Sequence, residues 1–94
     1  MRRYASKGKR DLIEKPCVEL LRKAGWQVVL VSTVNGPDAI AAKGGQNVCF
    51  EFKGKKGRKD QPQQQAWRDA WPGAIATVYS VEDLQQWLQI ANSE

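Results

Sequence analysis

Two strand-like segments joined by a pair of glycines constrain the fold of this chain more than any other feature. Residues 38–42 follow the turn signal of residues 35–37, and residues 47–53 form a second, mostly apolar segment. Between them, Gly44 and Gly45 lie at the centre of the loop 43–46. Glycine adopts the backbone conformations that a tight hairpin turn requires. The sequence therefore predicts a β-hairpin near the middle of the chain.

Helical and strand patterns flank this hairpin on both sides. Apolar residues recur at three- and four-residue steps from about Asp11, and Gly25 ends this first helix. Pro16 suits the first turn of a helix better than its interior, so a start nearer Ile13 is an open alternative. The other predicted elements are a strand over 26–32, a helix over 61–70, a strand over 74–79 and a last helix capped by residues 80–83.

The order of these elements defines the fold class. Three successive strands followed by a helical crossover to a fourth predict a mixed sheet with helices packed on it. We therefore expect an α/β protein of order α-β-β-β-α-β-α, with a mixed four-stranded sheet flanked by helices. The length of 94 residues suffices for one domain. We expect residues 1–10 to be a basic, loosely ordered segment and residues 11–94 to form that single domain.

The composition excludes several kinds of site and location. The chain has no histidine, which excludes His-containing zinc sites, Ser-His-Asp triads and hydrolases with a histidine base. Cys17 and Cys49 form no Cys-x-x-Cys pair and lie among apolar residues, so we expect buried free thiols. No apolar run approaches the roughly 20 residues of a membrane span. The basic N-terminal residues also lack the apolar stretch of a secretory signal. A cytoplasmic location without a membrane partner is therefore expected.

The predicted hairpin carries two carboxylates and a lysine. Asp38 begins one strand and Glu51 lies on the next; Lys53 shares a face with Glu51 because strand side chains alternate with period two. Carboxylate oxygens are ligands for Mg²⁺ or Mn²⁺, and the backbone carbonyl of Phe52 is placed to be a third ligand. Such a cation activates water and polarises a phosphodiester, while a lysine orients the nucleophile or stabilises the phosphate charge. The pattern therefore favours phosphodiester hydrolysis.

Each part of this pattern is common on its own. Glu-x-Lys and Pro-Asp recur in unrelated chains, and alternating charges usually mark a solvated strand face; the conjunction carries the hypothesis. Glu14 borders the buried side of the first helix and is a candidate third carboxylate, directly or through water, although a surface position or a cap is more frequent. An amide in the second helix could orient water or contact a phosphate, although helical glutamines are usually solvated. The candidates are Gln63, Gln64 and Gln65.

Positive charge is concentrated directly after the Glu-x-Lys. The net charge is +5, and a basic surface favours polyanions, most often nucleic acid. Trp67 and Trp71 lie one helical turn apart, and we expect them to pack inward rather than to stack on bases. The basic run is predicted to contact the DNA backbone. It comprises Lys55, Lys56, Arg58 and Lys59.

Taken in order along the chain, these motifs resemble a known family. They are similar to the VRR-NUC branch of the PD-(D/E)xK nuclease superfamily, in particular to its small stand-alone, phage-type members. The resemblance runs from about Ile13 to Leu88. The matching motifs are Ile13-Glu14-Lys15-Pro16, Leu20 to Gly25, Gly36-Pro37-Asp38, Gly44-Gly45, Glu51-Phe52-Lys53-Gly54, Gln64-Gln65-Ala66-Trp67 and residues 78–83.

The resemblance implies a restriction-endonuclease-like core and a metal-dependent DNA endonuclease. It implies a homodimer that cuts branched DNA such as Holliday junctions and leaves 5′-phosphate and 3′-hydroxyl ends. It also implies that the protein is located in the cytoplasm of a bacterium or of a phage-infected host cell. The active-site positions that it implies are Glu14, Asp38, Glu51, Lys53 and Gln64, with Gln64 chosen by its spacing to Trp67.

Two other functions are weighed against this one. A non-catalytic nucleic-acid-binding module on the same fold would bind DNA without cutting it. A protein-interaction domain would show no steep loss of DNA affinity with salt. The intact Asp38, Glu51 and Lys53 argue against both. Because one domain of this size cannot easily grip a four-way junction, a C₂ dimer is the expected assembly.

Overall fold

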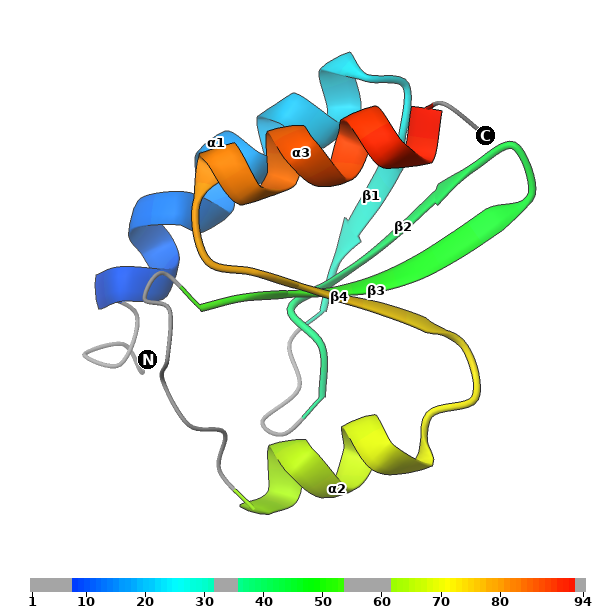
Figure 1. Ribbon diagram of the computed structural model, residues 1–94. Coiled ribbons are helices and arrows are strands. Elements are labelled where there is room, and N and C mark those ends of the chain that lie inside the picture. Colours follow the sequence, from blue (N-terminus) through cyan, green and yellow to red (C-terminus); the bar gives the residue numbers. More distant parts are fainter. Residues whose placement is uncertain (1–7, 32–35, 54–61, 93–94) are drawn as a thin grey trace.

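The computed structural model describes residues 8–31, 36–53 and 62–92. Within these residues the elements follow the predicted order, α-β-β-β-α-β-α (Figure 1). The helices are α1 (Gly8–Lys23), α2 (Pro62–Ala70) and α3 (Val81–Asn92). The strands are β1 (Gln27–Leu30), β2 (Ala39–Lys43), β3 (Gln46–Phe52) and β4 (Ala74–Val78).

The four strands form one mixed sheet in the order β1-β2-β3-β4. β2 pairs antiparallel with both β1 and β3, whereas β4 pairs parallel with β3. Gly44 and Gly45 join β2 to β3 with φ angles of 57° and 87°, in the left-handed region that favours glycine. The hairpin and the mixed sheet are therefore confirmed. β4 runs parallel to β3 because the connection through α2 returns the chain to the starting edge.

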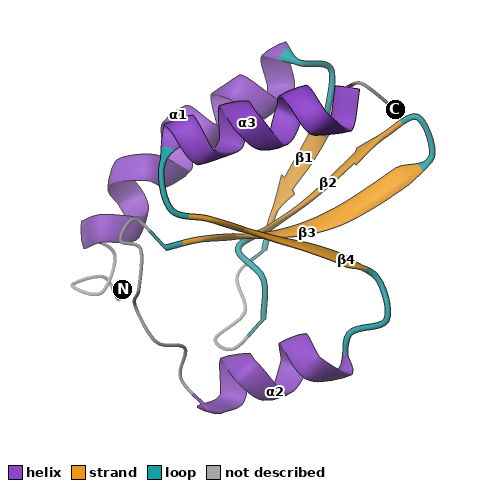
Figure 2. Ribbon diagram, in the orientation of Figure 1, coloured by secondary structure: helices purple, strands orange, loops and turns teal. Residues whose placement is uncertain are grey.

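Helices α1 and α3 together cover one face of the sheet (Figure 2). Alternate residues of β3 point to this face, and Phe50 packs there with Leu21 of α1 and Leu84 of α3, all fully buried. The ring of Phe50 meets Trp87 of α3 edge to face, with ring centroids 5.0 Å apart. Each buried side chain of this size contributes roughly 1.5–3 kcal/mol of transfer free energy. This core fixes β3 at the centre of the molecule.

Helix α2 lies on the opposite face of the sheet (Figure 2). The register places Val29, Ile40, Cys49 and Ile75 in one row across that face. Cys49 is buried, but Ile40 and Val29 are 36% and 63% exposed. The coverage of this face therefore ends before the β1 edge.

The start of α1 differs from the sequence prediction. The helix begins at Gly8, inside the segment expected to be loosely ordered, and Pro16 lies in its interior rather than in its first turn. Proline removes one backbone donor and clashes with the preceding turn. The helix continues because Cys17 and Leu21 in the next turns are fully buried against the sheet. Burial of that stripe outweighs the local preference.

The cysteines and the paired tryptophans test two further expectations. Cys17 and Cys49 are buried free thiols, as predicted. Trp67 and Trp71 contact each other edge to face with ring centroids 5.8 Å apart. Trp67 is half-buried, but Trp71 is exposed, so the expectation that both pack inward is wrong for Trp71. Across the residues that the structure describes, no helix has the length and apolarity that a membrane span needs.

Candidate active site

The hairpin brings Asp38 to the end of β3 that carries Glu51. Ala39 is paired with Phe50 at the start of β2, and the N–H of Asp38 donates to the carbonyl of Phe50 over 2.9 Å. Asp38 therefore lies directly before β2, beside the segment of β3 that carries Glu51. The carbonyl of Asp38 also accepts a hydrogen bond from Val31 N–H at 2.9 Å. The backbone at Asp38 is thus held between β1 and β3.

A third hydrogen bond fixes the side chain of Asp38. Its Oδ2 accepts the N–H of Phe52 over 2.8 Å in a part-buried position. The carboxylate therefore lies against the backbone of β3. A carboxylate that accepts a backbone N–H is oriented before any ligand arrives. The predicted role of the Phe52 carbonyl as a metal ligand stays a prediction.

Glu51 and Lys53 are charged residues in a buried strand. They lie on the face that α2 covers, two residues apart, and are only 2% and 8% exposed. The N–H of Lys53 donates to the carbonyl of Val78 over 2.9 Å, so pairing with β4 extends to this residue. Burial of a charged group is costly unless an opposite charge compensates it. Glu51 and Lys53 therefore do not belong to a solvated strand face.

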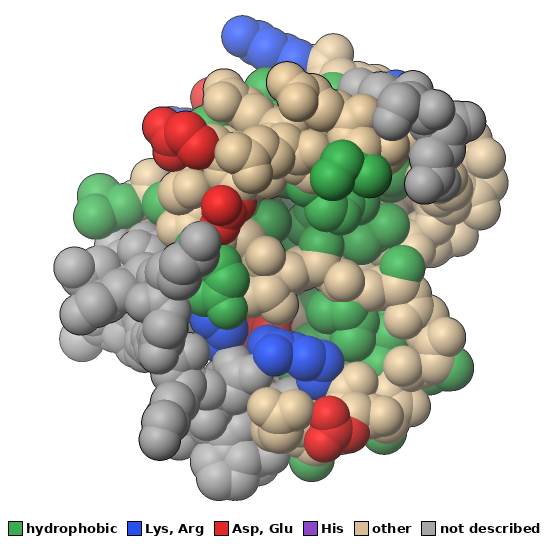
Figure 3. All heavy atoms as spheres, in the orientation of Figure 1, with side chains coloured by type: hydrophobic (Ala, Val, Ile, Leu, Met, Phe, Trp, Pro, Cys, Tyr) green, Lys and Arg blue, Asp and Glu red, His purple; other side chains and the backbone are tan. Residues whose placement is uncertain are grey.

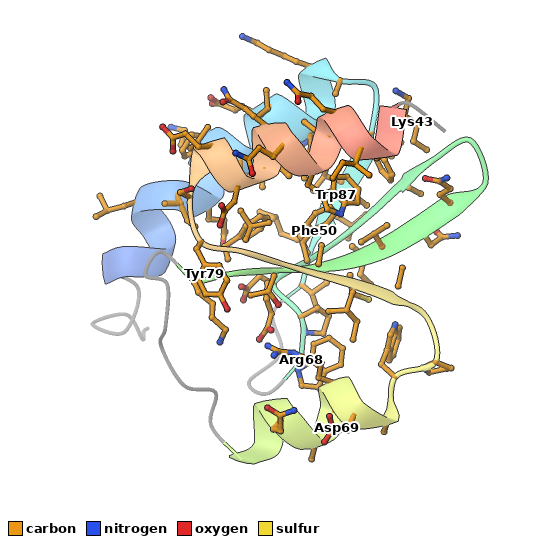
Figure 4. The ribbon with its side chains drawn as sticks, in the orientation of Figure 1. Lys43, Phe50, Arg68, Asp69, Tyr79 and Trp87 are labelled. Carbon is orange, nitrogen blue, oxygen red and sulfur yellow. The ribbon has the colours of Figure 1, made fainter. Side chains whose placement is uncertain are left out.

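Arg68 of α2 supplies the opposite charge to Glu51. Its Nη2 donates to Glu51 Oε1 in a part-buried ion pair. Figure 4 shows Arg68 in the space between α2 and the sheet. In the space-filling view, basic and acidic atoms gather in the hollow between α2 and the strands (Figure 3). Arg68 was missed by sequence reasoning; its spacing of four residues from Gln64 on one helix is the one signal that could have found it.

The structure describes only some of the other predicted site residues. Glu14 is half-buried on α1, which packs on the other face of the sheet. Gln63 and Gln64 lie within α2, but their side chains are outside the described part of the chain. Gln65 is exposed, and its amide donates to Asp69 Oδ1 at 3.0 Å. The basic run of Lys55, Lys56, Arg58 and Lys59 also lies outside the described residues.

The described residues fit a hard divalent cation bound by few protein ligands. Over the ranges 8–31, 36–53 and 62–92, no three acidic or cysteine side chains gather closely enough to form a metal cluster. Asp38 and Glu51 are two carboxylates at one point of the hairpin. Mg²⁺ is usually bound through one or two carboxylates, several waters and substrate phosphates. A two-carboxylate site therefore matches that ion better than it matches zinc.

Comparison with known proteins places the fold. No protein-family model and no curated protein matches the sequence. Among solved structures, a chain titled "VRR_NUC domain" superposes with a TM-score of 0.77 at 17% sequence identity. The superposition covers 86% of this chain and 95% of that one. The α/β architecture and the order of its elements are thus those of a known compact domain. This chain has the VRR_NUC fold.

Proposed function

We propose that this chain is a divalent-metal-dependent DNA endonuclease that hydrolyses phosphodiester bonds. The observation that carries the proposal is the burial of Glu51 and Lys53, which are 2% and 8% exposed, beside the half-buried Asp38, whose carboxylate accepts the N–H of Phe52. Buried charged groups of this kind concentrate at functional sites. A fold shared with a structure titled as a VRR_NUC domain supports the same activity.

In this proposal each strand residue has a distinct task. Asp38 and Glu51 hold Mg²⁺ or Mn²⁺, with the carbonyl of Phe52 as a further oxygen ligand. The bound ion supplies Lewis-acid polarisation of the phosphodiester and activation of water. Lys53 lies two residues beyond Glu51, where its ammonium group can orient the attacking water and stabilise negative charge on the phosphate. Its burial strengthens that interaction because the local dielectric constant is low.

Residues outside the hairpin are proposed to assist. Glu14 supports the ion through water. Gln64 contacts the phosphate or the attacking water, since position 64 shares a face of α2 with Arg68, four residues on. The exposed pairing of Gln65 with Asp69 supports this choice. The basic run holds the DNA backbone, which provides affinity without sequence preference. It consists of Lys55, Lys56, Arg58 and Lys59.

Cleavage of labelled DNA tests the proposal. Linear, flapped and four-way-junction substrates are incubated with Mg²⁺ or Mn²⁺, and the wild type is compared with Asp38→Asn and Lys53→Met. Loss of an electrostatic group at the reacting phosphate lowers the rate by about 100-fold or more. Asp69→Asn and Lys23→Met are matched controls at exposed positions, and both should cut like the wild type. Cleavage that persists in Asp38→Asn would refute the proposed site.

The substrate and the assembly are further parts of the proposal. We propose branched DNA, including Holliday junctions, as the preferred substrate and a homodimer as the active form. A C₂ dimer presents two identical sites to opposite strands of a junction. Faster cutting of the four-way junction than of linear DNA is the expected result. The products should carry 5′-phosphate and 3′-hydroxyl ends.

One observation favours a second candidate, a nucleic-acid-binding module without catalysis. Arg68 already engages the Glu51 oxygen that a metal ion would need. If that ion pair is permanent, the site binds phosphate but not metal. This module predicts salt-sensitive DNA binding that Asp38→Asn leaves unchanged, with no cleavage of any substrate.

A further inference from the structure

The ion pair between Arg68 and Glu51 joins a partly exposed side chain to a buried one. Glu51 is 2% exposed, whereas the Arg68 side chain, at 24%, reaches the surface. The buried partner is a residue of the central strand β3, where it pairs with Thr77 of β4. The other partner is a long side chain on a short helix. Of the two, Arg68 is the one that can change position without disturbing the sheet.

The same carboxylate oxygen serves two possible cations. Glu51 Oε1 accepts Arg68 Nη2 in this structure. In the proposed function, Glu51 is also a ligand of Mg²⁺ or Mn²⁺. A guanidinium and a divalent cation on one carboxylate repel each other, and that repulsion is strong where water is excluded. The two therefore compete for Glu51.

We propose that Arg68 exchanges partners during binding: it neutralises Glu51 in the metal-free protein, yields Oε1 when the divalent cation binds, and then contacts a DNA phosphate. The inference rests on the proposed function and assigns a role to a residue outside the motif. Guanidinium groups suit phosphate oxygens because they donate in a fixed fork. The arriving phosphate also neutralises the excess positive charge that the exchange creates.

This exchange couples the two ligands. Without DNA, Arg68 opposes the cation, so metal alone binds weakly. With DNA, the displaced guanidinium gains a new partner, so each ligand strengthens the binding of the other. The buried site is thereby kept neutral until substrate is present. A role for Arg68 confined to holding α2 would produce no such coupling.

The first experiment measures Mn²⁺ binding without DNA, by calorimetry and by the electron paramagnetic resonance signal of free Mn²⁺. Arg68→Met removes the charge and keeps much of the length of the side chain. Because a hydrogen bond to a charged group contributes about a factor of ten or more, Arg68→Met is expected to bind Mn²⁺ about ten-fold tighter than the wild type. Arg22→Met, which removes an exposed arginine bonded to the Val28 carbonyl, is the control and should match the wild type.

The second experiment measures DNA binding in Ca²⁺. There the order reverses, and Arg68→Met is expected to bind about ten-fold more weakly because a charged contact to phosphate is lost. Tighter Mn²⁺ binding combined with weaker DNA binding is the signature of the exchange. A purely structural role would weaken both. Mn²⁺ affinity in Arg68→Met that is equal to or below that of the wild type overturns the inference.

Two further variants keep the test decisive. Circular dichroism establishes that each variant is folded. If Arg68→Met is not folded, Arg68→Lys is used in its place. Its Mn²⁺ affinity is expected to lie between that of the wild type and that of a site without this charge. An affinity equal to that of the wild type counts against the exchange. Asp38→Asn separates the two proposals. If wild type and Asp38→Asn bind Mn²⁺ equally, the proposed metal site fails; if only the Arg68 effect is missing, the exchange alone fails.

Discussion

At the residue scale, Arg68 and Glu51 form a pair whose loss should be felt in stability. We predict that Arg68→Met lowers the free energy of unfolding by about 2 kcal/mol in EDTA, because it leaves a buried carboxylate without its counter-charge. Urea denaturation measures the difference. Added Mn²⁺ should restore much of the loss, since a cation replaces the missing charge. Arg22→Met should change stability by less than about 0.5 kcal/mol. Equal losses in the two variants would contradict the prediction.

Cys17 provides a prediction on pH at the same scale. Burial raises the pKa of this thiol from 9.0 to about 11, with the negative charges of Asp83 and Glu82 adding to the shift. The folded protein therefore keeps the thiol proton to a higher pH than the unfolded chain does. This contribution is complete below pH 9.0 and is lost as the pH rises towards about 11.

The measurement is the free energy of unfolding across that pH window. The wild type should lose on the order of 2 kcal/mol more than Cys17→Ala over the interval, since one pKa unit corresponds to about 1.4 kcal/mol. Only the difference in slope matters, because Cys17→Ala also leaves a small cavity. Parallel slopes in the two proteins would show that the thiol does not titrate in this window.

The candidate site was predictable where local geometry determines it. A hairpin and a period of two place Glu51 and Lys53 on one face, and the bond from Phe52 N–H to the Asp38 carboxylate holds Asp38 at the same end of the hairpin. Arg68 could not be predicted in this way. Its partner depends on how α2 crosses the sheet, which is a tertiary contact without a periodic signal in the sequence. The role of Glu14 likewise depends on where α1 lies relative to the end of β3.

At the scale of the elements, Pro16 is the clearest conflict between local preference and structure. It lies inside α1, where proline costs about 3 kcal/mol relative to alanine. We predict that Pro16→Ala raises the free energy of unfolding by about 1–2 kcal/mol, because it restores a helical N–H donor. Thermal unfolding followed by circular dichroism measures the change. A lower midpoint would mean that packing of the half-buried ring outweighs the lost hydrogen bond.

The other elements agree with their sequence signals to within one or two residues. Turn signals at residues 44–45 and 72–73 and the cap at Ser80 mark ends that need no tertiary contact to be recognised. Ser80 Oγ accepts the N–H of Asp83 over 3.1 Å, as a helix cap should. The start of α1 was predicted about three residues late, at Asp11, because the apolar repeat begins there, and the alternative start near Ile13, based on Pro16, was later still. Burial of Cys17 and Leu21 against β3 and α3 offsets the cost of Pro16 inside the helix.

At the scale of the whole molecule, the β1 side of the sheet offers an exposed apolar surface for the proposed dimer. Val29 and Ile40 are cross-strand neighbours on the half of the sheet that α2 leaves uncovered, and β1 is an edge strand. A second copy seated there would bury both side chains and the open strand edge. We predict that Ile40→Lys converts a dimer into a monomer of 10.6 kDa. Light scattering coupled to gel filtration measures the mass.

The control for this prediction is Leu12→Lys, which places the same charge at another exposed apolar residue, on α1. It should leave the mass of the dimer unchanged. A wild type that is monomeric at all concentrations would remove the dimer from the proposal. A dimer that survives Ile40→Lys would place its interface on another face.

The strand that carries Glu51 has a consequence for how the protein fails on heating. β3 is central in the sheet, and its residues from Val48 to Phe52 are buried without interruption. Amide hydrogens in such a strand exchange with solvent only through global unfolding, whereas frayed helices and edges open locally. Its geometry should therefore persist until the whole domain unfolds. On heating, the position of Glu51 and the fold of the whole domain should therefore be lost in the same transition.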